Sequence, residues 1–132
     1  MSYKSPAEIF ILRSLYGRTV SVPAPTSWYV GLLTAAETEP TFDPNYARQE
    51  VSNVTASFTS TLTVGDTTTV LLKPALVFGP STVSWPNIAK LGFFDALTAG
   101  NLWVVATFNF TFSVQPYDSF TVNPETVSLG QQ

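Results

Sequence analysis

The sequence predicts an all-β fold: a β-sandwich or jelly-roll-like barrel of short antiparallel strands with one short helix at the N-terminus. Two observations lead to this prediction. Thr, Val and Phe, which favour extended backbone, dominate the second half of the chain. Turn residues interrupt the apolar runs roughly every 8–12 residues, as they do in sandwiches and barrels. Because no internal repeat or low-complexity linker is visible, residues 1–132 are expected to form a single domain.

The predicted helix occupies about residues 6–16. Ser5 and Glu8 have the spacing of a capping box, and Pro6 suits the first helical turn. Gly17 suits a left-handed helix end. This helix is more apolar than a solvated amphipathic helix, so we expect it to pack on a sheet or on a neighbouring subunit. Its candidate interface residues are Ile9, Phe10 and Leu12.

The rest of the chain is expected to form strands. Residues 28–34 are continuously apolar, which indicates burial on both faces. Residues 54–62 alternate between apolar and polar, as a half-buried strand does. In the longest predicted strand, residues 102–112, three phenylalanines share one face: Phe108, Phe110 and Phe112. Shorter strands are expected at residues 68–73, 75–78, 88–94, 120–122 and 126–129.

The segments between these strands predict surface loops and turns. Residues 37–45 contain two prolines and no apolar pattern, so we expect their acids to be solvated: Glu37, Glu39 and Asp43. Turns are expected at residues 64–67, 98–101 and 115–118, and Gly100-Asn101 is expected to need positive φ.

The small number of charged residues indicates an assembly protein. Charged residues make up 11% of the chain and hydrophobic residues 45%, whereas an ordinary soluble domain has roughly 25% charged residues. We therefore expect another subunit to cover part of the apolar surface. The six basic residues are dispersed and the net charge is −3, which argues against nucleic-acid binding. The sequence shows no membrane span and no signal peptide, so we expect no membrane partner and assembly in a bacterial cytoplasm.

No catalytic or metal centre is predicted. The chain contains no histidine and no cysteine, which excludes a histidine base, a cysteine nucleophile and thiolate metal sites. Two carboxylate pairs are conceivable, Glu37 with Glu39 and Asp95 with Asp118, but loop and turn chemistry explains these residues. We expect no enzyme activity, no cofactor and no metal.

Three tryptophans and one tyrosine are candidates for contacts. Trp28 and Trp103 lie in apolar strand runs and are assigned to the core or an interface. Trp85 stands next to Pro86 in a turn-like segment, which makes it the candidate for an exposed aromatic contact. Tyr117 completes the predicted interface residues. If the protein were a module that binds host carbohydrate, Trp85 and Tyr117 would be its stacking platforms.

Several segments together resemble a family of small tailed-bacteriophage virion proteins, known as tail fibre-like or head decoration proteins. The resemblance covers nearly the whole chain in the right order. It rests on a short helix ending at Gly17, the aromatic strand at residues 28–36, Tyr-Ala-Arg-Gln at residues 46–49, and residues 92–102 and 117–120. Residues 61–73 are longer and richer in Thr than the family pattern, which is compatible with a protruding hairpin.

The resemblance implies a structural virion protein. Our first hypothesis is a capsid decoration, or cement, protein: a homotrimer on the capsid surface that binds the major capsid protein and stabilises the assembled head. The alternative is a tail or tail-fibre-associated subunit, and a carbohydrate-binding module is a third hypothesis. A long fibre shaft would show repeats, so the sequence favours a compact subunit.

Arg48 and Asp95 both belong to the segments that carry the resemblance. Arg48 is a rare charge in an apolar chain, and a structural ion pair with Asp95 would fix strand register and shield the charge. The alternative is that Arg48 is an exposed charge on an edge strand, where it blocks unwanted pairing.

Overall fold

The computed structural model describes residues 2–15, 24–54, 57–58, 62–64, 67–124 and 128–131. The elements follow one another in the order β1 (Ser2–Tyr3), α1 (Ser5–Leu15), β2 (Ser27–Thr34), β3 (Gln49–Ser52), β4 (Leu62–Val64), β5 (Thr67–Leu71), β6 (Leu76–Phe78), β7 (Trp85–Phe94), β8 (Leu102–Val114), β9 (Phe120–Val122) and β10 (Ser128–Gln131).

The largest layer is a five-stranded antiparallel sheet in the order β1-β8-β7-β2-β3. Its centre is the pair β2 and β7, in which Leu32 stands opposite Leu91 and both side chains are fully buried. Leu33, the neighbour of Leu32 on β2, points to the other face and is also buried. The prediction that this strand is buried on both faces is therefore confirmed.

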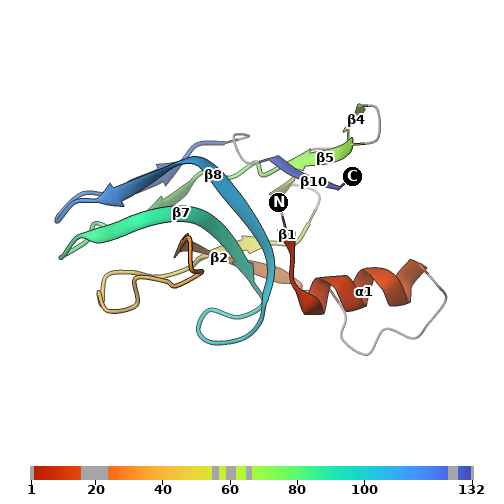
Figure 1. The fold of residues 1–132 in the computed structure, drawn as a ribbon, viewed down its shortest axis with the longest axis horizontal. Coiled ribbons are helices and arrows are strands. Elements are labelled where there is room, and N and C mark those ends of the chain that lie inside the picture. Colours follow the sequence, from red (N-terminus) through yellow and green to blue (C-terminus); the bar gives the residue numbers. More distant parts are fainter. Residues whose placement is uncertain are drawn as a thin grey trace.

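Two smaller antiparallel sheets accompany the large one: β10-β5-β4 and β6-β9. Figure 1 shows the curved ribbons of β7 and β8, the paired strands β5 and β10, and α1 extending away from the strands. The core joins the layers, because buried side chains of β6 and β9 pack with those of β2, β3, β7 and β8. The all-β, sandwich-like prediction is confirmed, and the described strands close no barrel.

The N-terminal arm joins the large sheet in a way that the sequence did not indicate. β1 pairs with β8 at Val104 and Val105, and the backbone of Lys4 donates to the carbonyl of Trp103 at 2.7 Å. The helix α1 follows directly. On α1, Ala7 is buried whereas Ile9 is exposed. The side chains of Phe10 and Leu12, and residue Gly17, lie outside the described part of the chain. No described helix has the length and hydropathy of a membrane span.

The middle of the chain differs in part from the prediction. Val54 lies in a bend and Phe58 only forms a bridge with Leu72, so the described residues of the expected strand 54–62 become strand only at Leu62, where β4 begins. Residues 55–56 and 59–61 of that expected strand are not among those described. β4 and β5 pair as a hairpin at one end of the molecule (Figure 1). The hairpin that the sequence allowed is therefore present, although its expected turn residues, Gly65 and Asp66, lie outside the described ranges.

Candidate interaction surfaces

Asp43 is a buried carboxylate that joins two loops. Its Oδ2 accepts hydrogen bonds from the Thr82 amide at 2.8 Å and from Trp85 Nε1 at 2.9 Å. Its Oδ1 accepts from the Asn45 amide at 2.9 Å and the Thr82 hydroxyl at 2.8 Å. Burial raises the pKa of Asp43, but these hydrogen bonds outweigh it and hold the pKa below its ordinary value. The expectation of a solvated acid is wrong for Asp43, which is 1% exposed, and for Glu39, whose side chain is 10% exposed.

Ser81 attaches a third loop to the same end of the molecule. It is buried, its hydroxyl donates to the Gln115 carbonyl at 2.7 Å, and its amide donates to the Asp118 carbonyl at 3.0 Å. The amide of Tyr117 donates in return to the Ser81 carbonyl at 2.8 Å. We call the three connected loops, residues 40–46, 79–85 and 115–119, the loop end. It lies at the left of Figure 1.

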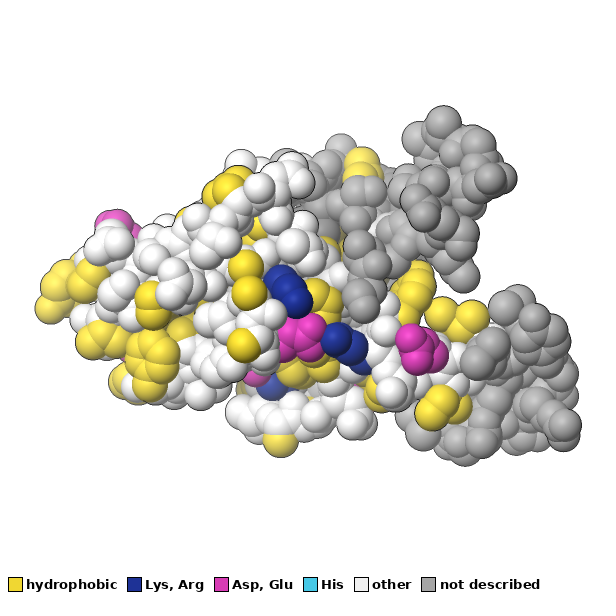
Figure 2. Space-filling view, in the orientation of Figure 1, with side chains coloured by type: hydrophobic (Ala, Val, Ile, Leu, Met, Phe, Trp, Pro, Cys, Tyr) yellow, Lys and Arg dark blue, Asp and Glu magenta, His cyan; other side chains and the backbone are white. Residues whose placement is uncertain are grey.

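The loop end presents apolar side chains to solvent. Phe42 is 62% exposed and Tyr117 80% exposed, and Val83 is also exposed. Tyr117 has φ 69°, a left-handed conformation that bulky residues rarely adopt. Figure 2 shows hydrophobic side chains over this end of the molecule. The surface position expected for Tyr117 and Ile9 agrees with the structure, but their role at an interface stays a prediction.

Trp85 does not lie where the sequence placed it. Its side chain is completely buried, and its indole N–H donates to Asp43. The ring also meets Tyr46 edge-on, with centroids 5.5 Å apart. The interpretation of Trp85 as an exposed contact is wrong, because β7 begins at Trp85 and directs the ring into the core.

Arg48 pairs with Glu39 and not with Asp95. The Nη2–Oε1 distance is 2.6 Å, and the Arg48 and Glu39 side chains are only 8% and 10% exposed. Arg48 Nη1 donates to the carbonyls of Ala96 at 2.7 Å and Ala99 at 2.8 Å. Its guanidinium carbon lies 3.5 Å from the centroid of the Phe94 ring, a cation–π contact. Both earlier interpretations are therefore wrong, since the charge is neither exposed nor paired with Asp95.

The carboxylate of Asp95 binds donors from the turn that follows it and from the start of β8. Its carboxylate accepts from the Asn101 amide at 2.7 Å and from Trp103 Nε1 at 3.1 Å. These bonds lower the pKa of Asp95 in spite of partial burial, which acts in the opposite direction. The expected positive φ occurs at Gly100, with Ala99 as the second such residue instead of Asn101. Arg48 thus reaches the segment that follows Asp95, but through backbone carbonyls.

Glu39 also fixes the ring of Tyr46. The Tyr46 hydroxyl donates to Glu39 Oε2 and accepts from the Leu32 amide at 3.0 Å. Burial first, and the hydrogen bond and charge of Glu39 second, raise the pKa of Tyr46. Gly31 permits this close approach, since a Cβ there would lie 2.6 Å from the Tyr46 hydroxyl and 2.7 Å from Glu39 Oε2.

Glu37, the third acid of the predicted loop, lies between two lysines. Lys4 Nζ is 2.8 Å and Lys90 Nζ 3.4 Å from Glu37 Oε2. The hydrogen bond from Lys4 is the main cause that lowers the pKa of Glu37. Through these two ion pairs, Glu37, in the loop after β2, connects the N-terminal arm to β7. In the described part of the chain, no group of three or more acids, histidines or cysteines could hold a metal ion.

A second candidate surface comes from a large bulge in β8. Lys90 pairs with Thr107 and Ile88 with Phe112, so two steps along β7 correspond to five along β8. The three extra residues bulge out of the ladder between β7 and β8. The Phe108 and Phe112 rings have centroids only 5.5 Å apart, whereas residues four apart on a regular strand are separated by about 13 Å.

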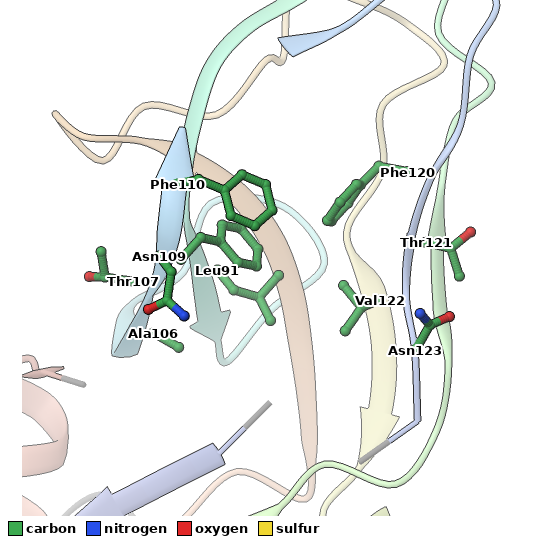
Figure 3. A pocket seen from close by; sticks show the side chains of 10 residues that line it. Leu91, Ala106, Thr107, Asn109, Phe110, Phe120, Thr121, Val122 and Asn123 are labelled. Carbon is green, nitrogen blue, oxygen red and sulfur yellow. The ribbon is translucent and has the colours of Figure 1, made fainter. Parts of the chain in front are cut away.

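The bulge forms one wall of an open groove of about 560 Å³. Phe108 and Phe110 belong to this wall, Phe120 and Val122 of β9 form the opposite wall, and Leu91 also lines the space. Figure 3 shows the Phe110 and Phe120 rings on opposite sides of the opening. None of the ten lining residues is ionisable. We call this site the phenylalanine groove.

The sequence signals for the two surfaces differ in strength. The alternation of Phe108, Phe110 and Phe112 predicted an aromatic face correctly, but no local sequence signal predicted the bulge. In a sequence such as Asp43-Pro44-Asn45, the aspartate side chain often accepts a hydrogen bond from the amide two residues later. This local pattern indicates the contact between Asp43 and the Asn45 amide. The bonds to Thr82 and Trp85 have no local signal.

Comparison with protein-family models relates the chain to a known family. A family model described as podophage GP4 fiber I protein gp80 matches residues 11–130. The matched part includes the loop end and the phenylalanine groove. None of the curated proteins compared with the chain matches it.

Proposed function

We propose that this chain, which belongs to the podophage GP4 fiber I protein gp80 family, is a structural subunit of the tail fibre apparatus. Membership in the family makes it a virion component of a tailed phage and a structural protein. The observation that supports the finer assignment is the match itself, because it extends over residues 11–130 and is described as a fibre protein.

The assignment reverses the order of our first two hypotheses. From the sequence, capsid decoration ranked above the tail, but a fibre family favours the tail alternative. The major capsid protein as partner, the capsid surface as location and the homotrimer all stay predictions. The carbohydrate hypothesis is weakened, because Trp85 is buried and only Tyr117 of its two stacking platforms is exposed.

The physical features of the chain suit a subunit that works by contact. The acids of its long loop are engaged in internal hydrogen bonds and ion pairs: Glu37, Glu39 and Asp43. Apolar side chains are exposed at the loop end and beside the phenylalanine groove. An arrangement of fixed loops and exposed apolar groups favours packing against other proteins over chemistry on a substrate.

Location in the particle tests the proposal. Intact virions are labelled with antibody against the purified chain and imaged by electron cryo-microscopy. We expect label on the tail, and particles made without this protein should keep stable heads but lose fibre density. Label on the head shell, together with heads that release DNA when the protein is missing, would overturn the tail assignment in favour of capsid decoration.

A further inference from the structure

We propose that the phenylalanine groove is the surface on which a second copy of this chain packs. This inference goes beyond the tail assignment and does not depend on it. A chain that associates with itself but labels the head would overturn the function proposed above and leave this inference intact.

The groove exposes an aromatic side chain of a kind that proteins normally bury. Phe110 is 64% exposed although its ring belongs to a cluster of four phenylalanines. Phe112 and Phe120 stack within this cluster with centroids 4.4 Å apart. Aromatic rings in a desolvated centre carry much of the free energy of protein interfaces. The cluster therefore resembles the aromatic centre of a protein interface in which only Phe110 is still exposed to solvent.

The backbone beside the groove is open too. β1 covers the outer edge of β8 only at Val104 and Val105, and β9 pairs with β6 alone among the described strands. Exposed strand edges with apolar side chains favour association with another chain. Among the described strands, none pairs with this edge of β8 from Ala106 onward.

Two features identify the occupant as a second copy. In an interface between identical copies related by a two-fold axis, each patch meets itself, so a charged patch would meet its own charge. The ten residues of the groove carry no charge although the whole chain has a net charge of −3. Two copies can therefore pack groove to groove without like-charge repulsion, which a charged part of the surface would produce.

The sequence of the bulged strand is also self-complementary. Residues 107–113 read Thr-Phe-Asn-Phe-Thr-Phe-Ser, a pattern that is nearly the same in both directions around Phe110. When two such strands face each other in antiparallel orientation, Phe108 faces Phe112 of the other copy and Thr107 faces Ser113. Aromatic pairs and hydroxyl pairs are favourable neighbours across strands. In this register the exposed Phe110 of each copy faces Phe110 of the other at the two-fold axis, and the two rings cover each other.

Analytical ultracentrifugation of the full chain tests this contact. The groove is smaller than a standard interface of roughly 20–30 residues a side, so we expect a micromolar dissociation constant and a mass that rises with concentration. Phe110→Ser should weaken association at least tenfold. Phe42→Ser is the matched control, since Phe42 is equally exposed but belongs to the loop end. It should leave association unchanged.

Crosslinking provides a second readout. The chain has no cysteine, so Asn109→Cys introduces a single thiol that lines the groove, and Thr41→Cys introduces one at the loop end. In the proposed register the two thiols introduced at position 109 are diagonal neighbours, so a short bismaleimide is used to link them. We expect a rapid covalent dimer from the first variant only. A wild type that stays monomeric up to ~200 µM would overturn the proposal, as would equal loss of association in the two phenylalanine variants. If Phe110→Ser instead blocks only incorporation into particles, the groove binds a different virion protein and the inference fails.

Discussion

The loops held by buried carboxylates and the phenylalanine groove are built in opposite ways. In the loops, Asp43 accepts hydrogen bonds from the distant residues Thr82 and Trp85. Glu39 accepts them from Arg48. Both carboxylates are almost removed from water. In the groove, phenylalanine rings contact one another without polar partners, and Phe110 remains largely exposed. One region is complete within the chain, whereas the other leaves apolar surface uncovered.

This difference indicates how each region contributes. A buried polar network needs all its partners, because a buried donor or acceptor left without a partner costs more than the bond contributes. The loops therefore depend on specific residues for stability. An open apolar cluster has no such requirement within the subunit. The favourable free energy of burying its rings is gained only when another surface covers them. Substitutions in the loops should lower stability, and substitutions in the groove should lower association.

The largest effect is expected from Arg48→Met. The substitution leaves the Glu39 carboxylate buried without its cation and removes the donors to the carbonyls of Ala96 and Ala99. Removal of one partner of a buried pair costs about 3–5 kcal/mol. Urea denaturation followed by Trp fluorescence measures the free energy of unfolding. The double variant with Glu39→Leu should lose less than the sum of the two single variants, and simple additivity would contradict a coupled pair.

Asp43→Asn should lower the urea midpoint by roughly 1 M. An amide cannot accept from Thr82, Asn45 and Trp85 together as the carboxylate does. Asp118→Asn is the control, because Asp118 belongs to the same loop end but is exposed. If both variants shift the midpoint equally, the buried network is not what stabilises the loop end.

The same carboxylate predicts a pH dependence. The pKa of Asp43 is lower in the folded protein than the ordinary value of 3.8. Its contribution to stability is therefore complete above pH 3.8 and is lost as the pH falls toward the folded-state pKa. Urea midpoints measured from pH 7 downward should fall less steeply below that pH in Asp43→Asn than in the wild type. The pKa values of Glu37 and Asp95 are also lowered, so part of the dependence should remain in the variant.

The smallest effect on stability is expected in the groove. Phe110→Ser should change the free energy of unfolding by about 0.5 kcal/mol or less, because the ring is 64% exposed in the single chain. The measurement must be made at a concentration where the chain is monomeric. A loss above ~1.5 kcal/mol would show that Phe110 stabilises the subunit itself and would remove the contrast between the two regions.

Much of the fold was predictable because it depends on neighbours along the chain. The apolar run in β2, the alternation that places Phe108, Phe110 and Phe112 on one face, and the Pro and Gly turns are local patterns. The candidate surfaces were predicted less well. Tyr117 was placed correctly at an exposed turn, but Trp85 was wrongly placed on the surface, since its neighbour Pro86 indicated a turn and β7 in fact begins there.

The sequence alone determined the all-β class, the exposed turn at Tyr117 and the shortage of charge that points to partners. Only the tertiary structure decided that Arg48 meets Glu39, that Asp43 binds Trp85, and that β8 bulges to open the groove. The physical reason is that these contacts depend on how the loops and strands pack. Strand and turn preferences act over a few residues, whereas a buried charge takes whichever partner the packed loops bring within hydrogen-bond reach.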